Sequence, residues 1–236
     1  LKARDMIYCF SGMGNSQWVA DKLQGLLQDE TDSFGLIFPI YAWGVPKVVT
    51  QYIQKHLEEI KTAKYVCAVM TCGDDIGYAD TILNQLLEGK LDAAFSVHMP
   101  NTYVCLPGFD VDPYDVAKAK VQETLKRLPA IAESIGKREK KTEVVRGGAA
   151  WLKTYVLRPV FNRFLVTDKY FHTKIHCIHC KRCVRGCPQN NIAIDPNDQI
   201  QWKHENCTGC LRCYHRCPCH SVHFGIFTKN KGQHHL

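Results

Sequence analysis

Two cysteine runs in the last third of the chain decide its architecture. The first reads C-I-H-C-K-R-C-V-R-G-C-P and contains Cys177, Cys180, Cys183, Cys187 and Pro188. The second starts thirty residues later, reads C-T-G-C-L-R-C-Y-H-R-C-P, and contains Cys207, Cys210, Cys213, Cys217 and Pro218. Three cysteines spaced two residues apart can wrap a tight loop over one centre. The fourth, stopped by proline, starts a helix that points away.

This repeated spacing is the signature of bacterial two-cluster ferredoxins, in which cysteine thiolates hold two [4Fe–4S] cubanes and the fourth cysteine serves the other cluster. The prediction is one cluster on Cys177, Cys180, Cys183 and Cys217, and a second on Cys207, Cys210, Cys213 and Cys187. Zinc would use four ligands and leave the fourth cysteine of each run unexplained. Disulfides suit small secreted domains, and no signal peptide is visible.

Length and composition set the class of protein. With 236 residues, 45% of them hydrophobic, the chain is long enough to form one domain with a hydrophobic core and a small additional domain. No apolar run approaches the length of a membrane span. Five cysteines lie outside the two sets (Cys9, Cys67, Cys72, Cys105 and Cys219), an odd number that favours reduced thiols in a cytoplasmic protein.

The net charge of +7 is unevenly distributed. Residues 1–135 hold 12 Lys/Arg against 17 Asp/Glu, giving −5, and residues 136–236 hold 18 against 6, giving +12. Two clusters with thiolate ligands offset about four positive charges, and a flavin phosphate about two more. We expect the remaining excess to suit an acidic redox partner rather than nucleic acid.

A phosphate-binding loop is predicted near the start of the chain. The apolar run 6–10 leads into Ser11, Gly12, Met13, Gly14, Asn15 and Ser16, and a helical pattern follows. Backbone N–H groups in such a strand–loop–helix arrangement can cradle an anion. The loop lacks the nucleoside-triphosphate and dinucleotide patterns. It resembles the FMN-phosphate loop of flavodoxin-like proteins, with Met13 in place of the usual threonine; the alternative is a glycine-rich turn.

Two further loops follow apolar strands. The run 36–41 ends in Tyr41, Ala42, Trp43 and Gly44, and the run 65–70 ends in Thr71, Cys72, Gly73, Asp74, Asp75, Gly77 and Tyr78. In flavodoxin-like proteins, the first of these loops places an aromatic residue against the flavin ring and the second contacts the ring edge. Asn101, Thr102 and Tyr103, after the run 94–99, are rim candidates. The alternative for Trp43 is an aromatic core residue.

Strands alternating with helices predict an α/β, doubly wound parallel sheet, with ligands outside the carboxyl ends of the strands. Only residues 28–35 separate the first helix from the next strand, so we expect the second strand of a flavodoxin sheet to be missing or vestigial. Residues 110–135 predict a helix broken at Pro129. The segment 136–143 reads as a charged connector.

The expected division is a flavodoxin-like FMN-binding domain (1–135), a basic linker and interdomain helix (136–170), a small α+β ferredoxin domain (171–227) and a C-terminal tail (228–236). Within 149–165, aromatic and aliphatic residues alternate with Arg and Lys. Packing across the two domains is the favoured interpretation, because Pro159 interrupts the helix; a membrane-surface helix is the alternative.

The whole chain resembles the bacterial ferrodoxins, flavodoxin–ferredoxin fusions of anaerobic type. The resemblance rests on F-S-G-M-G-N-S (10–16), F-P-I-Y-A-W-G-V-P (38–46), T-C-G (71–73), both cysteine runs and T-K-N-K-G-Q-H-H (228–235). It implies FMN and two [4Fe–4S] clusters in one polypeptide, and names no substrate.

An electron carrier that relays single electrons between the clusters and FMN is the favoured function. The alternatives are a flavin-dependent reductase of a quinone-like or nitro compound and a redox sensor with a degenerate flavin site. No catalytic residue stands at a diagnostic spacing, although Asp74, Asp75, Tyr78, His98 and Tyr103 are candidate proton donors.

Overall fold

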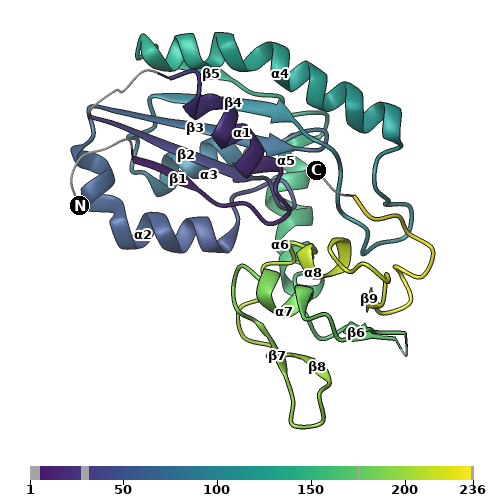
Figure 1. The fold of residues 1–236 in the computed structure, drawn as a ribbon. Coiled ribbons are helices and arrows are strands. Elements are labelled where there is room, and N and C mark those ends of the chain that lie inside the picture. Colours follow the sequence, from purple (N-terminus) through teal and green to yellow (C-terminus); the bar gives the residue numbers. More distant parts are fainter. Residues whose placement is uncertain (1–5, 28–31, 175, 235–236) are drawn as a thin grey trace.

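A five-stranded sheet flanked by helices and a smaller cysteine-rich unit lie against each other in the computed structural model (Figure 1). The structure describes residues 6–27, 32–174 and 176–234. The sheet strands are β1 (Met6–Cys9), β2 (Ser33–Pro39), β3 (Tyr65–Cys72), β4 (Ala93–His98) and β5 (Lys141–Glu143). The helices beside them are α1 (Asn15–Gln24), α2 (Lys47–Thr62), α3 (Ala79–Leu86) and α4 (Tyr114–Gly136).

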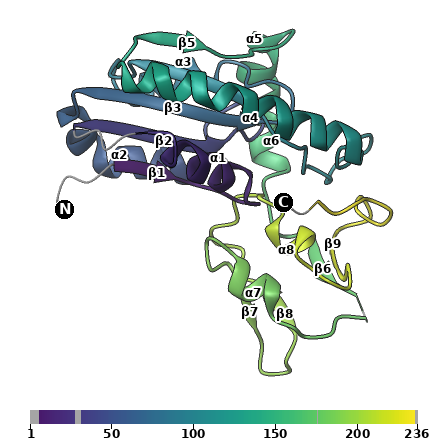
Figure 2. The ribbon, with the colours of Figure 1, turned by 45° about the horizontal axis from the view of Figure 1, so that its top comes forward.

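All five strands are parallel and follow chain order, β1-β2-β3-β4-β5. Alternate side chains point to opposite faces. Ile37, Cys67 and Phe95 face α1 and α4, while Leu36 and Ala68 belong to the core under α2 and α3. Helices therefore cover both faces (Figure 2). This arrangement is consistent with a flavodoxin-like α/β fold.

Successive strands always step in one direction, yet the connecting helices lie on two faces. Crossovers through α1 and α4 therefore have the opposite hand to those through α2 and α3, so one pair departs from the right-handed rule. If a further strand lay beyond β1, the crossover through α1 would run from β1 in the opposite direction. It would then have the same hand as the crossovers through α2 and α3. Among the described residues, β1 lies at the sheet edge, as the expected loss of the second strand requires, but the sheet still has five parallel strands because the three-residue β5 joins it at the opposite edge. Part of the segment expected to lack that strand, 28–31, is outside the described residues.

Two sequence expectations in this unit were wrong. The charged connector 136–143 contains β5, whose three residues pair with Ala93–Phe95 of β4. Helix α4 also continues through Pro129 instead of breaking there. Pro129 and Leu125, one turn before it, are both exposed, so solvent can satisfy the carbonyl that lost its N–H partner.

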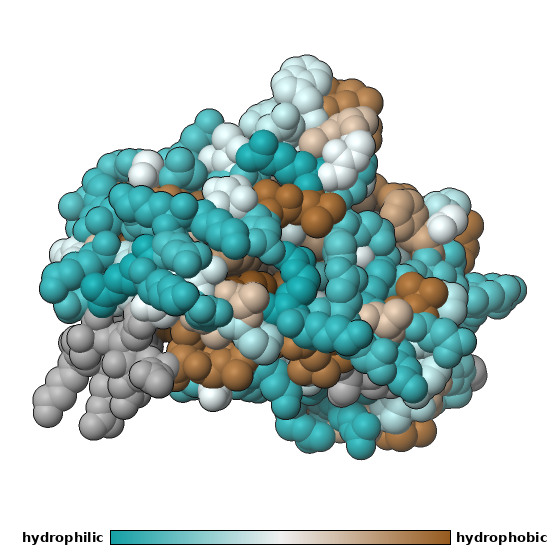
Figure 3. Space-filling view, turned by 90° about the horizontal axis from the view of Figure 1, so that it is seen from above, coloured by the Kyte–Doolittle hydropathy of each residue, from teal (hydrophilic) through white to brown (hydrophobic). Residues whose placement is uncertain are grey.

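The segment between the two units is helical from 150 to 164 and is here called the interdomain helix. It consists of α5 (Ala150–Leu152), the π-helical turn η1 (Lys153–Leu157) and α6 (Arg158–Phe164). Pro159 does not interrupt this helix, contrary to expectation: the chain stays helical through it, and the wider π-helical turn η1 lies directly before α6. Its outer side exposes large apolar residues such as Trp151, Val160 and Phe164. Seen from the α4 side, apolar side chains gather on a projection of an otherwise mainly hydrophilic surface (Figure 3).

The cysteine-rich unit has a twofold internal repeat, in which a short helix ends before the fourth cysteine of each run; the expectation that this cysteine starts a helix was wrong. Its elements are β6 (Phe171–Thr173), α7 (Arg182–Gly186), β7 (Ile192–Ile194), β8 (Ile200–Trp202), α8 (Arg212–His215) and β9 (Val222–Phe224). β7 and β8 form the hairpin that two short apolar runs joined by the turn residues 195–198 predict, and β6 pairs with β9. Residues 231–234 return to the sheet unit, where Gly232 N–H donates to Asp110 Oδ1 (2.9 Å). The predicted tail therefore ties the two units together.

Candidate functional site

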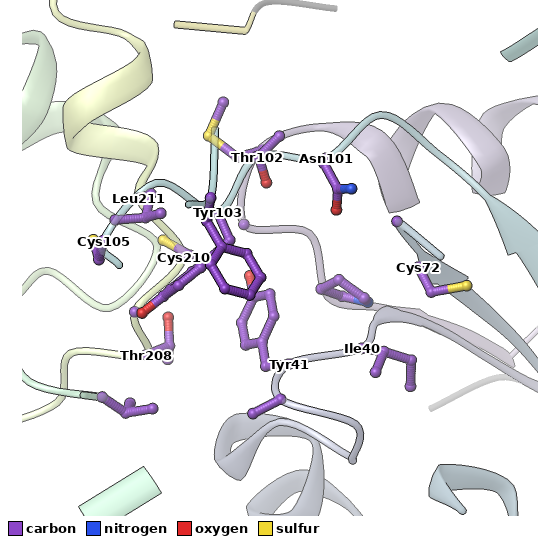
Figure 4. Close-up of a pocket in the computed structure, with 18 of the residues that line it drawn as sticks. Ile40, Tyr41, Cys72, Asn101, Thr102, Tyr103, Cys105, Thr208, Cys210 and Leu211 are labelled. Atoms are coloured by element: carbon purple, nitrogen blue, oxygen red, sulfur yellow. The ribbon is translucent and has the colours of Figure 1, made fainter. Parts of the chain in front are cut away.

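A cavity of about 530 Å³ opens at the carboxyl ends of β1 to β4. The helices after β1 and β2 leave for opposite faces of the sheet, which opens a crevice between the two loops. The interdomain helix and the cysteine-rich unit supply the other walls. Figure 4 shows Tyr41 and Tyr103 between Ile40, Cys72 and Asn101 on one side and Thr208, Cys210 and Leu211 on the other.

The loop 11–16 forms one wall and leads into α1. The Gly14 N–H donates to Ser11 Oγ (3.1 Å), which closes the loop. Gly14 has φ +127°, a conformation that only glycine adopts without strain. No side chain caps α1 in the described structure, so its first amide groups are available to an anion. The Ser16 hydroxyl instead bonds the Thr71 hydroxyl (2.8 Å) and joins this loop to β3.

The loop after β2 is a tight two-residue turn. Tyr41 and Gly44 exchange both backbone hydrogen bonds at 3.2 Å, and the residues between them, Ala42 and Trp43, have φ of 46° and 56°. Positive φ at both central positions is unusual for residues other than glycine and asparagine, and such strain concentrates at functional sites. The turn presents Tyr41 and Trp43 to the cavity.

Close packing also fixes the loop after β3. A Cβ on Gly73 would lie 1.8 Å from Asn101 Oδ1, so only glycine allows the rim residue Asn101 to approach. Burial raises the pKa of Cys72 to about 12, helped by the charges of Asp75 and Asp74. Burial opposes ionisation of Asp74 too, but the hydrogen bond from Asn101 and the charge of Lys120 outweigh it, and its pKa is lowered.

The interdomain helix contributes a wall that the sequence did not predict. Lys153 Nζ bonds Asp75 Oδ2 (2.6 Å) and lies 5.7 Å from the centre of the Trp43 ring. The Phe161 ring lies 5.3 Å from that of Tyr103. The helix is held by Thr154, whose hydroxyl accepts the Tyr78 N–H (2.9 Å). Nothing in the local sequence of 153–165 indicated a ligand-facing role.

Most of the predicted flavin residues line the cavity: Ser11, Gly12, Met13, Asn15, Ser16, Tyr41, Ala42, Trp43, Thr71, Cys72 and Gly73. Gly14, Gly44, Gly77 and Tyr78 do not. Gly14 shapes the first loop, and a Cβ on Gly44 would lie 2.0 Å from Arg158 Nε of the interdomain helix. Gly77 and Tyr78 contact the same helix, so three of the four position a wall of the cavity.

The eight motif cysteines gather in two groups inside the small unit. One small cavity is lined by Cys177, Cys180, Cys183 and Cys217, with Cys219 beside them. The other is lined by Cys187, Cys207, Cys210 and Cys213. Each group thus contains three cysteines of one run and the fourth of the other.

The surroundings of these sulfurs favour a polynuclear centre. Among the described residues, no three Cys, His, Asp or Glu side chains converge on one metal ion. Thiolates around a single zinc would lie about 3.8 Å apart; Cys217 Sγ and Cys219 Sγ have this separation (3.8 Å), but a pair of thiolates is not a four-ligand zinc site. Backbone N–H groups point at the sulfurs instead, from Ser221 to Cys217 Sγ (3.1 Å) and from Asn191 to Cys187 Sγ (3.3 Å). Such hydrogen bonds help set the potentials of iron–sulfur clusters.

A buried carboxylate organises the second group. Asp168, only 4% exposed, accepts hydrogen bonds from Asn191 Nδ2 (2.6 Å), His204 Nδ1 (2.8 Å) and the His204 N–H (3.0 Å). Burial alone would raise the pKa of Asp168, but the bonds from His204 and Asn191 outweigh it and lower the pKa. Asn191 Oδ1 in turn accepts the N–H groups of Glu205 and Asn206, just before Cys207.

The large cavity and the second cysteine group share a wall. Cys210 lines both, and it is the only one of the eight motif cysteines to do so among the described residues. A Cβ on Gly12 would lie 2.3 Å from the Tyr41 hydroxyl and 2.5 Å from Cys210 Cβ. The absence of a side chain at Gly12 therefore lets the two units touch here. Burial raises the pKa of Tyr41 well above its usual value, and the negative charges of Cys210 and Cys207 raise it further.

Comparison with known proteins identifies the small unit. Residues 169–218 match the model of a 4Fe-4S dicluster domain. The comparisons with curated proteins and with solved structures find no match. The C-terminal part of the chain is therefore a ferredoxin-like iron–sulfur domain, which indicates electron transfer. No helix in the described part of the chain is long and apolar enough to cross a bilayer.

Proposed function

We propose that this protein carries electrons between two [4Fe–4S] clusters and an FMN bound in the large cavity. The clusters are assigned to Cys177, Cys180, Cys183 and Cys217 (cluster 1) and to Cys187, Cys207, Cys210 and Cys213 (cluster 2). The observation that carries the proposal is Cys210, which lines both the cluster 2 cavity and the large cavity. A ligand thiolate at the wall of a second redox site gives electrons a short path between them.

The cavity residues fit FMN in three respects. Its volume of about 530 Å³ is within the range of cofactor sites. The uncapped start of α1 and the closed loop at Ser11–Gly14 suit a phosphate. Asn15 Oδ1 and Tyr103 Oη are buried without a hydrogen-bond partner, and both residues line the cavity. Buried polar atoms seldom stay unsatisfied, so these two favour a polar ligand.

The side chains have distinct parts in this scheme. Tyr41, Trp43 and Tyr103 provide aromatic surface for a flat ring. Lys153 is the only cation lining the cavity among the described residues, and Asp75 holds it in place. When bound, FMN supplies a centre that exchanges one or two electrons. Lys153 can donate a hydrogen bond to it, while Asp75 and two other carboxylates that line the cavity, Asp74 and Asp110, offset the positive charge of Lys153.

The test uses anaerobically purified protein and a pair of matched variants. Iron, acid-labile sulfide and extracted flavin are quantified first; we expect iron and sulfide in the ratio of [4Fe–4S] clusters, and FMN. Cys180→Ser and Cys210→Ser alter equivalent positions of the two runs. Electron paramagnetic resonance should show one cluster perturbed in each, with exchange between cluster and flavin lost more severely in Cys210→Ser. Zinc without sulfide would refute the cluster assignment, and failure to bind added FMN would refute the flavin site.

A further inference from the structure

The thirty-residue repeat gives the domain two equivalent ligand loops, Ile178–Lys181 and Thr208–Leu211. Their backbones match in conformation. The second and fourth residues have positive φ in both: His179 (50°) and Lys181 (60°) in the first loop, Gly209 (67°) and Leu211 (61°) in the second. A short helix follows each, α7 and α8. The two loops therefore present similar shapes on the two sides of the domain.

Only the second loop is covered. Leu211 is 4% exposed, Cys210 touches the Gly12 loop of the sheet unit, and Gly209 lies against Val166 at the end of the interdomain helix. In the first loop, Ile178, at the position equivalent to Thr208, is 63% exposed. One loop is thus docked on a redox site, while its structural equivalent is free.

The free loop has an apolar centre and a basic rim. Residues 169–194 contain five Lys/Arg and no Asp or Glu. Lys181, Arg182 and Arg185 follow Ile178 directly and are exposed. None of these three forms a salt bridge within the described part of the chain, although Arg185 donates to the Cys180 carbonyl (2.9 Å). The nearest acid paired with the loop is Asp198, 3.4 Å from His179 Nδ1.

We propose that the loop Ile178–Lys181 is the docking surface for an acidic one-electron redox protein, which it contacts as the loop Thr208–Leu211 contacts the sheet unit. This proposal rests on the proposed function, since it gives cluster 1 the role of exchanging electrons with the outside. One electron passes from the reduced partner to the cluster, without bond or proton transfer. An apolar centre with a charged rim is typical of transient interfaces, and the exposed basic side chains of this rim complement an acidic partner surface.

The experiment measures anaerobic reduction by an acidic 2[4Fe–4S] ferredoxin in a stopped-flow instrument. In K181E/R182E, we expect the second-order rate constant at low salt to fall about tenfold or more and its salt dependence to weaken, because steering supplies gains of this order. Ile178→Ser should lower the rate without changing the salt dependence. The control K55E/K126E makes the same charge change on exposed residues of α2 and α4 and should leave the rate nearly unchanged.

Two further measurements separate the possible failures. Iron and sulfide content, and reduction by dithionite, report whether the clusters are present and active in each variant; their absence from the unmodified protein would refute the proposed function itself. The docking proposal is wrong if the clusters are intact and the second-order rate constant of K181E/R182E equals that of the unmodified protein or of the control. Faster reduction of the K181E/R182E variant by the acidic ferredoxin would also overturn it.

Discussion

Replacing Gly12 with alanine tests the contact at which the two units meet. The new Cβ would lie 2.3 Å from the Tyr41 hydroxyl and 2.5 Å from Cys210 Cβ, whereas carbon contacts are normally near 3.5–4.0 Å. The neighbours must therefore retreat by roughly 1 Å. Tyr41 is held by its strained turn, and Cys210 by the ligand loop, so the dicluster domain has to shift away from the cavity.

Overpacking of this kind costs about 1–3 kcal/mol. For a chain of this length, each kcal/mol lowers the melting temperature by about 2–4 °C. We expect Gly12→Ala to melt roughly 2–12 °C below the unmodified holoprotein in calorimetry, with both clusters and FMN still bound and slower exchange between them. Gly148→Ala is the control, because nothing lies within 4 Å of its added Cβ. If the two variants melt alike and exchange electrons equally fast, the contact at Gly12 does not couple the units.

Three further predictions concern buried groups around the site. Asp168→Asn should reduce the free energy of unfolding by about 2–3 kcal/mol, because it removes the charge that accepts three hydrogen bonds. Since the folded pKa of Asp168 is lowered, its contribution should be complete above about pH 4 and disappear as the pH falls through the folded value. In urea titrations between pH 3 and 7, the stability difference between the unmodified protein and Asp168→Asn should therefore shrink below about pH 4, and a difference that does not change with pH would contradict this. Cys72, whose pKa burial raises to about 12, should resist iodoacetamide at pH 8 in the folded protein, and mass spectrometry showing rapid alkylation would contradict its burial. Gly77→Ala should destabilise the protein by about 1–3 kcal/mol more than Gly89→Ala, since both glycines have positive φ but only Gly77 would meet the Thr154 hydroxyl at 2.4 Å; equal urea midpoints would refute this.

The sequence predicted the elements that carry a strong apolar pattern. The buried strand 65–72 and the hairpin 192–202 appear where alternation, runs of β-formers and turn residues indicated them. β5 escaped prediction because all three residues, Lys141–Glu143, are exposed and polar. Its position depends on an open edge of β4, which the local sequence does not reveal. The continuation of α4 past Pro129 depends similarly on that turn facing solvent.

The candidate site was predictable only where its residues follow strands. Ser11, Tyr41 and Thr71 come directly after apolar runs, and parallel strands bring their ends together. Lys153, Phe161 and Cys210 reach the same cavity by the docking of helices and domains. That docking depends on shape, such as the space left at Gly12, which spacing in the sequence cannot report.

The cavity is assembled from segments that are synthesised far apart in time. Residues 11–16 and 41–44 emerge and can fold long before Thr208–Leu211 exist, since domains generally fold from the N-terminus during translation. The last wall also depends on a domain whose folding is coupled to metal binding. We therefore expect a nascent chain to have an open flavin crevice that iron supply later closes, so that FMN enters before the clusters are built. In iron-starved cells, the crevice would remain open, and the proposed FMN would have no cluster beside it.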